Sequence, residues 1–491
     1  MPTHEDAKVP ASDVLDTAAA GPRALRGSLL RLGAYGGGTL LALVAQPLVA
    51  RHLGRVGYGR YTLAIAIATI ATGFTEGGVS VVALREYTSL TGSERENTLA
   101  NMLGIRTVLN AASVAGAVAF VLIAGYQGTV LVATVLAACG LALQITQTVV
   151  AVPLQGELRF GWVAAADLLR QFVSTVLIVA LVVAGTGVIP LVAVLVPANL
   201  AALALTRITV RGKMPRLPRF QLTVSLPLLR DTVPFAIAIA LSVTYFRLSV
   251  VLVSLIAGAN QLGIFSYSYR IVEVLVGLPP LVIGAAYPIL ARAASDDRER
   301  FAHATRRIFE LAVVAAVWLA VCIELGARFG VEVIGGHAAT PAAAVLRIQG
   351  LAVVGTFVAV SLAFPLLAVR GYRGTMYANL CGLVATVVVG VTLIPTLGAR
   401  GAAVGTVAGE LALALANGVA LLRARRGLGL QWAVIPVSAV AGAVGLAAGH
   451  LVGIHPLFEI FVATVVYAVA LAALGRFPPE VAHALRLDRL R

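Results

Sequence analysis

Charged side chains lie inside long apolar runs of this sequence, where their solvation is costly. Arg247 lies in the middle of one run, two residues after Tyr245, with no acidic residue within one helical turn. An arginine in such surroundings needs a water-filled cavity or an anion. Guanidinium groups bind phosphate through charge-assisted and often bidentate hydrogen bonds. Arg247 therefore predicts a cavity that holds an anionic ligand.

Four other charged residues fall in apolar runs that correspond to one another in the two halves of the chain. Arg270 and Glu273 are three residues apart on one helical face, Arg31 is near the start of the first run, and Glu76 precedes Gly77-Gly78 in the second. Two simpler explanations stay open: Arg270 and Glu273 neutralise each other, and Arg31 extends to water. The candidate substrate-binding residues are Arg247, Arg270, Glu273, Arg31, Glu76 and Tyr245.

The remaining charges within apolar runs have structural explanations of the same kind. Asp167 and Arg170 are spaced for an intrahelical ion pair. Glu324 and Arg347 are near the ends of their runs, where long side chains reach the interface. Glu410 and Glu459 complete the set.

Motifs for enzymatic chemistry are missing from the sequence. No GxxxxGK[ST] phosphate loop, HExxH zinc motif or GxSxG nucleophile turn occurs. The three cysteines, Cys139, Cys322 and Cys381, each lie alone in an apolar run, which favours small buried hydrophobes over a metal site or disulfides. We therefore expect no enzyme activity, no cofactor and no metal.

The composition is that of an integral membrane protein. Hydrophobic residues make up 59% and charged residues 12% of the 491 residues, with a mean hydropathy of +0.94. Soluble domains carry about 25% charged residues. A spanning helix needs about 20 apolar residues. The sequence predicts an all-α protein with about fourteen spans: 28–50, 61–84, 104–124, 129–152, 163–184, 188–206, 233–256, 266–290, 307–326, 342–369, 375–396, 401–422, 432–452 and 457–475. Val331 to Ala344 could instead be a short re-entrant segment.

A short pattern occurs twice and indicates an internal duplication. Gly54 to Tyr61 and Gly258 to Phe265 both read glycine, four residues, glycine, one residue, aromatic, at an offset of 204. Each copy separates two apolar runs and predicts a tight turn at the membrane surface. The repeat predicts two pseudo-symmetric lobes of six helices plus two C-terminal helices. The predicted parts are a cytoplasmic N-terminal tail (1–27), an N-lobe (28–206), a basic cytoplasmic linker (207–232), a C-lobe (233–422), two last spans (423–475) and a cytoplasmic C-terminal tail (476–491).

The distribution of positive charge predicts the orientation. The net charge is +15, but the arginines are spread between apolar runs, so we expect no nucleic acid partner. Of the 37 Lys and Arg residues, 27 lie in or beside segments on one side of the predicted membrane and 6 on the other. Positive charge accumulates on cytoplasmic loops. Both termini are therefore predicted to be cytoplasmic, with the linker at 207–232 resting on anionic membrane lipids.

Five stretches resemble the polysaccharide-biosynthesis (O-antigen, Wzx-type) flippases of the multidrug/oligosaccharidyl-lipid/polysaccharide exporter superfamily. They are ARHLGRVGYGRYTLA at 50–64, GGVSVVALRE at 77–86, GANQLGIFSYSYRIVEVL at 258–275, YPILARAASDDRERF at 287–301 and IPTLGARGAAVGTVAGE at 394–410. Together with the fourteen predicted spans, the resemblance covers nearly the whole chain.

The resemblance implies a cationic cavity lined by the first, second, seventh and eighth spans. It also implies flipping of an undecaprenyl-pyrophosphate-linked oligosaccharide from the cytoplasmic to the outer leaflet of the bacterial inner membrane by alternating access. An ion gradient or the membrane potential would supply the energy, and polysaccharide polymerases are possible partners. The first predicted outer loop departs from the usual charge bias, because it carries Arg51, Arg55 and Arg60.

Three other functions stay open at this stage. The lipid II flippases of the same superfamily share fourteen spans and a cationic cavity. The multidrug/cation antiporters usually have twelve spans and hold cations with acidic residues. A scaffold in a synthase complex would not need an arginine such as Arg247 in the middle of a span.

Overall fold

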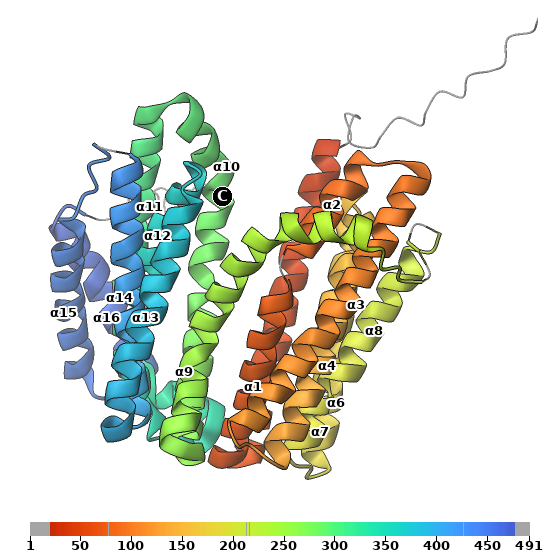
Figure 1. The fold of residues 1–491 in the computed structure, drawn as a ribbon. Coiled ribbons are helices and arrows are strands. Elements are labelled where there is room, and N and C mark those ends of the chain that lie inside the picture. The colour runs from red at the N-terminus through yellow and green to blue at the C-terminus, as the bar shows by residue number, and fades with distance from the viewer. Residues whose placement is uncertain (1–19, 77, 213, 216, 426, 477–491) are drawn as a thin grey trace, which may run out of the picture. The chain divides into compact units, whose positions relative to one another are not determined.

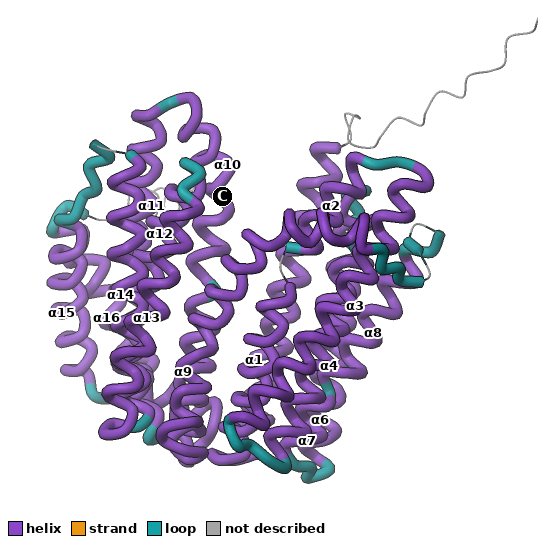
Figure 2. Tube along the Cα trace, viewed as in Figure 1, coloured by secondary structure: helices purple, strands orange, loops and turns teal. Residues whose placement is uncertain are grey.

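The computed structural model describes residues 20–476, apart from 77, 213, 216 and 426. This part of the chain is helical, without strands (Figure 2). The helices, shown in Figure 1, are α1 (Ala20–Glu76), α2 (Val79–Ser89), α3 (Gly92–Ile123), α4 (Thr129–Val150), α5 (Val152–Gly156), α6 (Phe160–Val183), α7 (Val188–Ala193), α8 (Leu195–Thr209), α9 (Leu222–Val276), α10 (Leu278–Asp296), α11 (Arg298–Gly335), the 3₁₀ helix η2 (Gly336–Ala339), α12 (Ala342–Ala368), α13 (Tyr372–Leu397), α14 (Ala399–Ala424), α15 (Val434–Val452) and α16 (Pro456–Ala473).

The helices agree with the predicted number of membrane crossings. In the described part of the chain, eleven helical segments are long and apolar enough to span a membrane. One of them, Ala240–Gly284, is divided by a backbone break at Gly258, and α1, which is outside this set, is divided in the same way at Gly54. Counting both arms of α1 and α9 gives fourteen crossings. The fold class predicted from the sequence is confirmed.

The duplicated pattern produces the same backbone break in both halves. Gly54 has φ 63° and ψ −173°, and Gly258 has φ 77° and ψ 179°. Residues that carry a Cβ atom rarely adopt these φ and ψ angles, so glycine is required at both positions. The predicted turns are thus single-residue breaks, and the rest of each pattern is helical.

The second glycine of each pattern, Gly59 or Gly263, allows two helices to pack closely. A Cβ atom on Gly59 would lie 2.9 Å from the backbone nitrogen of Gly263, and one on Gly263 would lie 2.2 Å from the Arg55 carbonyl oxygen. The two copies of the pattern therefore pack backbone against backbone. Any side chain at these glycines would separate the helices.

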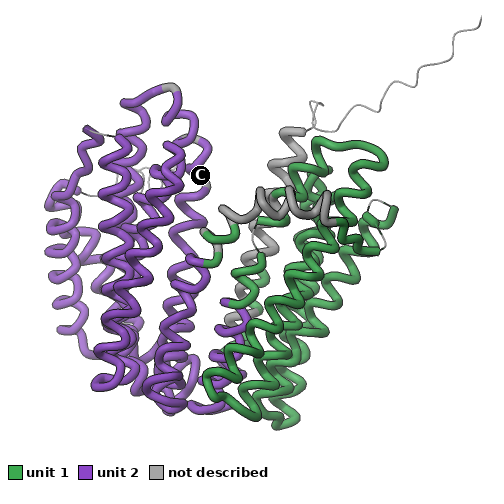
Figure 3. The backbone as a smooth tube through the Cα atoms, viewed as in Figure 1, with its two compact units in different colours: residues 1–46, 71–240 green, residues 47–70, 241–491 purple. Residues whose placement is uncertain are grey.

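The described chain forms two compact units, shown in different colours in Figure 3. One contains residues 1–46 and 71–240, and the other contains residues 47–70 and 241–491. All three boundaries cut through a long helix: two lie in α1 and one lies in α9. The units differ from the lobes predicted at 28–206 and 233–422, because part of α1 packs with the second half of the chain.

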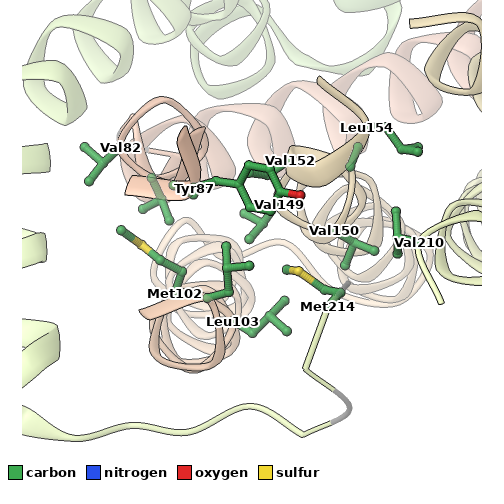
Figure 4. Packing of buried hydrophobic residues seen from close by; sticks show 14 of the residues in the cluster. Val82, Tyr87, Met102, Leu103, Val149, Val150, Val152, Leu154, Val210 and Met214 are labelled. Carbon is green, nitrogen blue, oxygen red and sulfur yellow. The ribbon is translucent and has the colours of Figure 1, made fainter. Parts of the chain in front are cut away.

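In the first unit, an apolar cluster joins α2, α3 and the short helix α5. Figure 4 shows Val82, Tyr87, Met102 and Leu154 among its buried members. The Tyr87 hydroxyl donates to Glu157 at 3.1 Å, which satisfies the polar end of this largely buried ring. The cluster therefore packs α2, which belongs to the second predicted span, against α3 and α5.

In the second unit, a row of glycines on α14 allows close packing with α13. A Cβ atom on Gly405 would lie 3.1 Å from the backbone of Gly390, and one on Gly409 would meet the side chain of Thr386. Gly401, Gly405 and Gly409 are spaced four residues apart, which places them on one face of α14 and lets the two helices approach closely.

Several boundaries differ from the prediction. The second span is interrupted, since α1 ends at Glu76 and α2 begins at Val79. The alternative of a re-entrant segment at Val331 to Ala344 is wrong, because α11 continues to Gly335 and one 3₁₀ turn leads into α12. Asp297 explains where α11 begins: its carboxylate accepts a hydrogen bond from the Arg300 backbone N–H at 2.9 Å.

Candidate functional site

A cavity of about 370 Å³ lies in the second unit and is lined mainly by α9, α12, α13 and α14. Its polar lining residues are Thr69, Tyr245, Arg247, Ser249, Tyr269, Glu273, Thr356, Thr386, Thr406 and Glu410. Three of the six candidates from the sequence, Tyr245, Arg247 and Glu273, line this cavity. Tyr245 and Glu410, which are 165 positions apart in the chain, thus meet at one site because four helices pack around it.

Arg247 is paired, contrary to the prediction. Its Nη2 atom lies 2.5 Å from Glu273 Oε1, on the other arm of α9. The sequence excluded an acidic partner only within the same helical turn, whereas the break at Gly258 folds the second arm of α9 back along the first. The expectation that this arginine has no acidic neighbour is therefore wrong.

Glu273 is shared by two arginines. Its Oε2 atom accepts a hydrogen bond from Arg270 Nη1 at 2.8 Å while Oε1 contacts Arg247. The suggestion that Arg270 and Glu273 form an intrahelical pair agrees with this geometry, although Arg270 itself does not line the cavity. Two guanidinium groups and one carboxylate leave a net charge of +1. Each guanidinium has five N–H donors, so both retain donors for a further anion.

One tyrosine of α9, Tyr269, supports Arg247. The Tyr269 hydroxyl donates to the Phe246 carbonyl oxygen at 2.5 Å, and its ring centroid is 5.8 Å from the Arg247 guanidinium carbon. This contact is a cation–π interaction that helps to hold the charge at the cavity wall. Arg247 is thus fixed from two sides, by a carboxylate and by an aromatic face.

Tyr245 and Glu410 form a second polar group in the same cavity. Glu410 is 3% exposed, and its Oε2 atom has no hydrogen-bond partner in the described structure. Tyr245 and Thr356 are the neighbours that interact with this carboxyl group, although the Tyr245 hydroxyl does not complete a hydrogen bond. The sequence analysis recorded Glu410 without a role, because nothing in its local sequence indicates such complete burial.

The other two candidates belong to the first unit. Arg31 lies in α1, and its side chain is outside the described residues. Glu76 is half-buried at the end of α1, close enough to Arg106 for their charges to interact. Whether either residue contributes to a substrate site stays a prediction.

Arg106, within the predicted span 104–124, was missed by the sequence analysis. Its side chain is fully buried. Nη1 and Nη2 donate to the carbonyl oxygens of Thr75 and Glu76, both at 3.0 Å. These are the last carbonyls of α1, where a positive charge is favourable. Arg106 therefore closes the end of this helix.

Two further pairs of in-span charges lie in contact. Arg170 and Asp167 are 3.2 Å apart, as the spacing predicts. Arg347 and Glu324 are 3.3 Å apart on neighbouring helices. The sequence analysis expected these last two side chains to reach water separately, but their half-exposed ends meet each other.

Two of the arginines in the first predicted outer loop bind backbone carbonyls. Arg51 Nη2 donates to the Val333 oxygen at 2.8 Å, and Arg55 Nη2 donates to the Ala338 oxygen at 2.8 Å. Both acceptors are at the end of α11 or in η2, where the helix leaves its last carbonyls unpaired. Helix capping thus explains two of the three charges that break the usual charge bias.

This arrangement of helices is that of the MOP-superfamily transporters. A lipid II flippase, MurJ, in an inward closed conformation matches with a TM-score of 0.76 at 15% identity, covering 91% of this chain and 99% of that one. An inward-facing multidrug resistance MATE transporter matches with a TM-score of 0.65 at 16% identity, covering 82% and 98%. A MOP-superfamily transporter from Pyrococcus furiosus, whose binding pocket is described as having reverse polarity, matches with a TM-score of 0.57 at 16% identity, covering 83% and 95%.

The match to a family model is more specific than the likeness in fold. A model of the family described as polysaccharide biosynthesis protein matches residues 24–294. The chain belongs to this family, and it is a multi-pass membrane protein with a transporter fold. Comparison with curated proteins finds no match.

Proposed function

We propose that this protein flips an undecaprenyl-pyrophosphate-linked oligosaccharide from the cytoplasmic to the outer leaflet of the bacterial inner membrane for export of a cell-surface polysaccharide. The observation that carries the proposal is the net positive cluster of Arg247, Arg270 and Glu273 beside a cavity in a transporter fold. A pyrophosphate is a dianionic or more highly charged group with many acceptor oxygens. Guanidinium N–H donors that Glu273 does not use can form charge-assisted hydrogen bonds with these oxygens.

Family membership supports a substrate connected with polysaccharide synthesis. The likeness in fold to a lipid II flippase supports a lipid-linked cargo. The positive-inside bias supports an orientation with both termini in the cytoplasm. An ion gradient is the proposed energy source, since no nucleotide-binding motif occurs in the sequence.

The multidrug antiporters are the second candidate, since their fold also matches. Glu410 is the observation in their favour, because a buried carboxylate suits a cationic ligand. Arg247, which lines the same cavity, and Arg270, which shares Glu273 with it, oppose binding of a cation. We therefore rank the flippase first.

The test is mass spectrometry of polyprenyl-linked glycans in cells that lack the protein, compared with wild-type cells and with cells complemented by the intact gene. Accumulation of a lipid-linked oligosaccharide supports the proposal and identifies the cargo. Accumulation of a lipid-linked muropeptide instead would assign the chain to lipid II transport. An unchanged glycan pool together with greater sensitivity to cationic drugs would favour the antiporter.

A further inference from the structure

Another cavity, of about 850 Å³, lies in the first unit at the end of α8. Its charged lining consists of three arginines from α8 and the chain that follows it, and one acidic residue from α3: Arg207, Arg211, Arg219 and Glu96. Three positive charges and one negative charge give this lining a net charge of +2. Glu96 can neutralise only one guanidinium group, so the cavity attracts an anion.

Two of these arginines have guanidinium groups that are available to a ligand. Arg211 and Arg219 are exposed, and their side chains form no hydrogen bond or ion pair with another described residue. Each guanidinium group has five N–H donors in a planar fork. This fork matches the oxygen atoms of a phosphate group, often through two hydrogen bonds at once. A phosphate group is therefore the anion that fits this lining.

The chain that follows α8 is fixed against α3 near Arg219. The Arg219 backbone N–H donates to the Ala100 carbonyl oxygen at 2.9 Å, and the Gln221 backbone N–H donates to the Asn101 side-chain oxygen at 2.8 Å. A Cβ atom on Gly104 would overlap the Arg219 carbonyl oxygen, so this segment lies directly on the backbone of α3. Donors on a fixed segment lose less conformational entropy on binding than donors on a freely moving loop.

The same connection is also anchored close to Arg211. Val210 and Met214 are buried in the apolar cluster of the first unit, which Figure 4 shows. Arg211 directly follows Val210 in the chain. The positions of the arginines around the cavity are thus set by packing on both sides of the described part of this connection.

Apolar side chains line the same cavity. Ile208, in the last turn of α8, and Leu217 are both exposed there. The segment Val188–Thr209 is long and apolar enough to span a membrane, and the cavity lies at the end of it that is predicted to be cytoplasmic. A ligand at this position meets positive charge beside exposed apolar surface. A lipid with an anionic headgroup combines the two matching properties.

We propose that this cavity binds one anionic phospholipid, with its phosphate at Arg207, Arg211 and Arg219 and an acyl chain along Ile208 and Leu217. The sequence predicted that the linker at 207–232 rests on anionic lipids in general. A cavity with fixed walls instead gives a single site that takes one lipid molecule. This proposal goes beyond the transport function proposed above and does not depend on the identity of the cargo.

The test is native mass spectrometry of the purified full-length protein in a neutral detergent, titrated separately with phosphatidylglycerol, phosphatidylcholine and inorganic phosphate. The wild-type protein is expected to bind one phosphatidylglycerol more tightly than any further molecule, and more tightly than phosphatidylcholine, whose headgroup has no net charge. Arg211→Gln combined with Arg219→Gln should weaken this first binding event roughly twenty-five-fold, since each basic residue near an anionic headgroup contributes about fivefold. Both side chains are exposed, and the Arg219 anchor is a backbone hydrogen bond, so the double variant should fold.

Arg370→Gln combined with Arg373→Gln is the matched control. These two arginines are also exposed on the predicted cytoplasmic side, but they do not line the cavity. The control should keep the tight first binding event. An equal loss of binding in the control would reduce the site to a general attraction between charges, and the proposal would fail.

Three other results would also overturn the proposal. They are equal binding of phosphatidylcholine, unchanged binding of phosphatidylglycerol by the Arg211 and Arg219 double variant, and tight binding of inorganic phosphate alone, which would assign the cavity to a soluble phosphate compound. The titration contains no polyprenyl-linked glycan. Its outcome is therefore separate from the test of the proposed transport function.

Discussion

At the scale of single residues, arginine has different roles at different positions of this chain. Arg106 is buried and closes a helix end through two backbone carbonyls. Arg247 faces a cavity and shares Glu273 with Arg270. Both lie in apolar sequence, and only their partners distinguish a structural arginine from a candidate for binding substrate. Both terminal nitrogen atoms of Arg106 donate to backbone carbonyls, so we assign this residue no role in transport.

Replacing Arg247 tests its proposed role. Arg247→Ala should lower flipping by roughly ten- to hundredfold, since hydrogen bonds to a charged group contribute about 1.5–3 kcal/mol. Arg247→Lys should restore part of the activity, because an ammonium group keeps the charge but loses the planar fork. The measurement is complementation of the glycan-accumulation phenotype, with the amount of protein in the membrane determined in parallel.

Arg347→Ala is the control for this prediction, because Arg347 also has an acidic partner but lies away from the cavity. It should transport normally. Glu273 keeps Arg270 as a partner when Arg247 is removed, so insertion and folding should survive. Normal transport by Arg247→Ala would exclude this arginine from the mechanism.

At the scale of elements, the glycine breaks decide which helices meet. Gly54 and Gly258 interrupt α1 and α9 by one residue each, and in α9 the break places the second arm beside the part of the first arm that contains Arg247. This arrangement brings Glu273 to Arg247 across 26 positions of sequence. The close approach of Gly59 and Gly263 then locks the two repeated patterns together. A small local feature, repeated once, thus positions the candidate site.

Substituting alanine for Gly54 should destabilise the protein by about 1–3 kcal/mol, because the backbone there lies in a region that side chains avoid. No atom lies within 4 Å of the added Cβ, so the cost arises from conformation alone. Gly258→Ala should behave in the same way. The measurement is the apparent thermal unfolding midpoint in detergent.

Gly116→Ala is the matched control, because Gly116 is helical, lies in α3 and also has open space around a Cβ atom. Alanine favours a helix over glycine by about 1 kcal/mol, so this variant should be neutral or slightly more stable. Equal midpoints for Gly54→Ala and Gly116→Ala would contradict the conformational explanation.

At the scale of the whole molecule, charge bias and apolar surface define its placement in a membrane. Large hydrophobic side chains are exposed along the helices, among them Ile123, Val183, Val282 and Leu451, each more than 70% exposed. Lipid tails are as apolar as these side chains, so in a membrane their exposure does not have the free-energy cost that it has in water. The arginine bias then predicts which ends face the cytoplasm.

The orientation can be tested at the two ends of one helix. Ser93 is exposed at the start of α3, on the predicted cytoplasmic side, and Gln127 is exposed just beyond its end. In a cysteine-free background, Gln127→Cys should react with a membrane-impermeant maleimide in intact cells. Ser93→Cys should react only after permeabilisation, and the reverse pattern would invert the proposed topology.

The sequence alone determined the class of fold, because hydropathy, span length and the repeated glycine pattern act locally along the chain. It also selected Tyr245, Arg247, Arg270 and Glu273 as candidates for substrate binding, since charged and polar groups are rare in apolar runs. Tertiary structure decided their partners: the Arg247–Glu273 contact joins two arms of α9, and Glu410 reaches Tyr245 from another helix. Such contacts depend on how helices pack against one another. The spacing of residues within one helix does not show which residues from other parts of the chain will lie beside them.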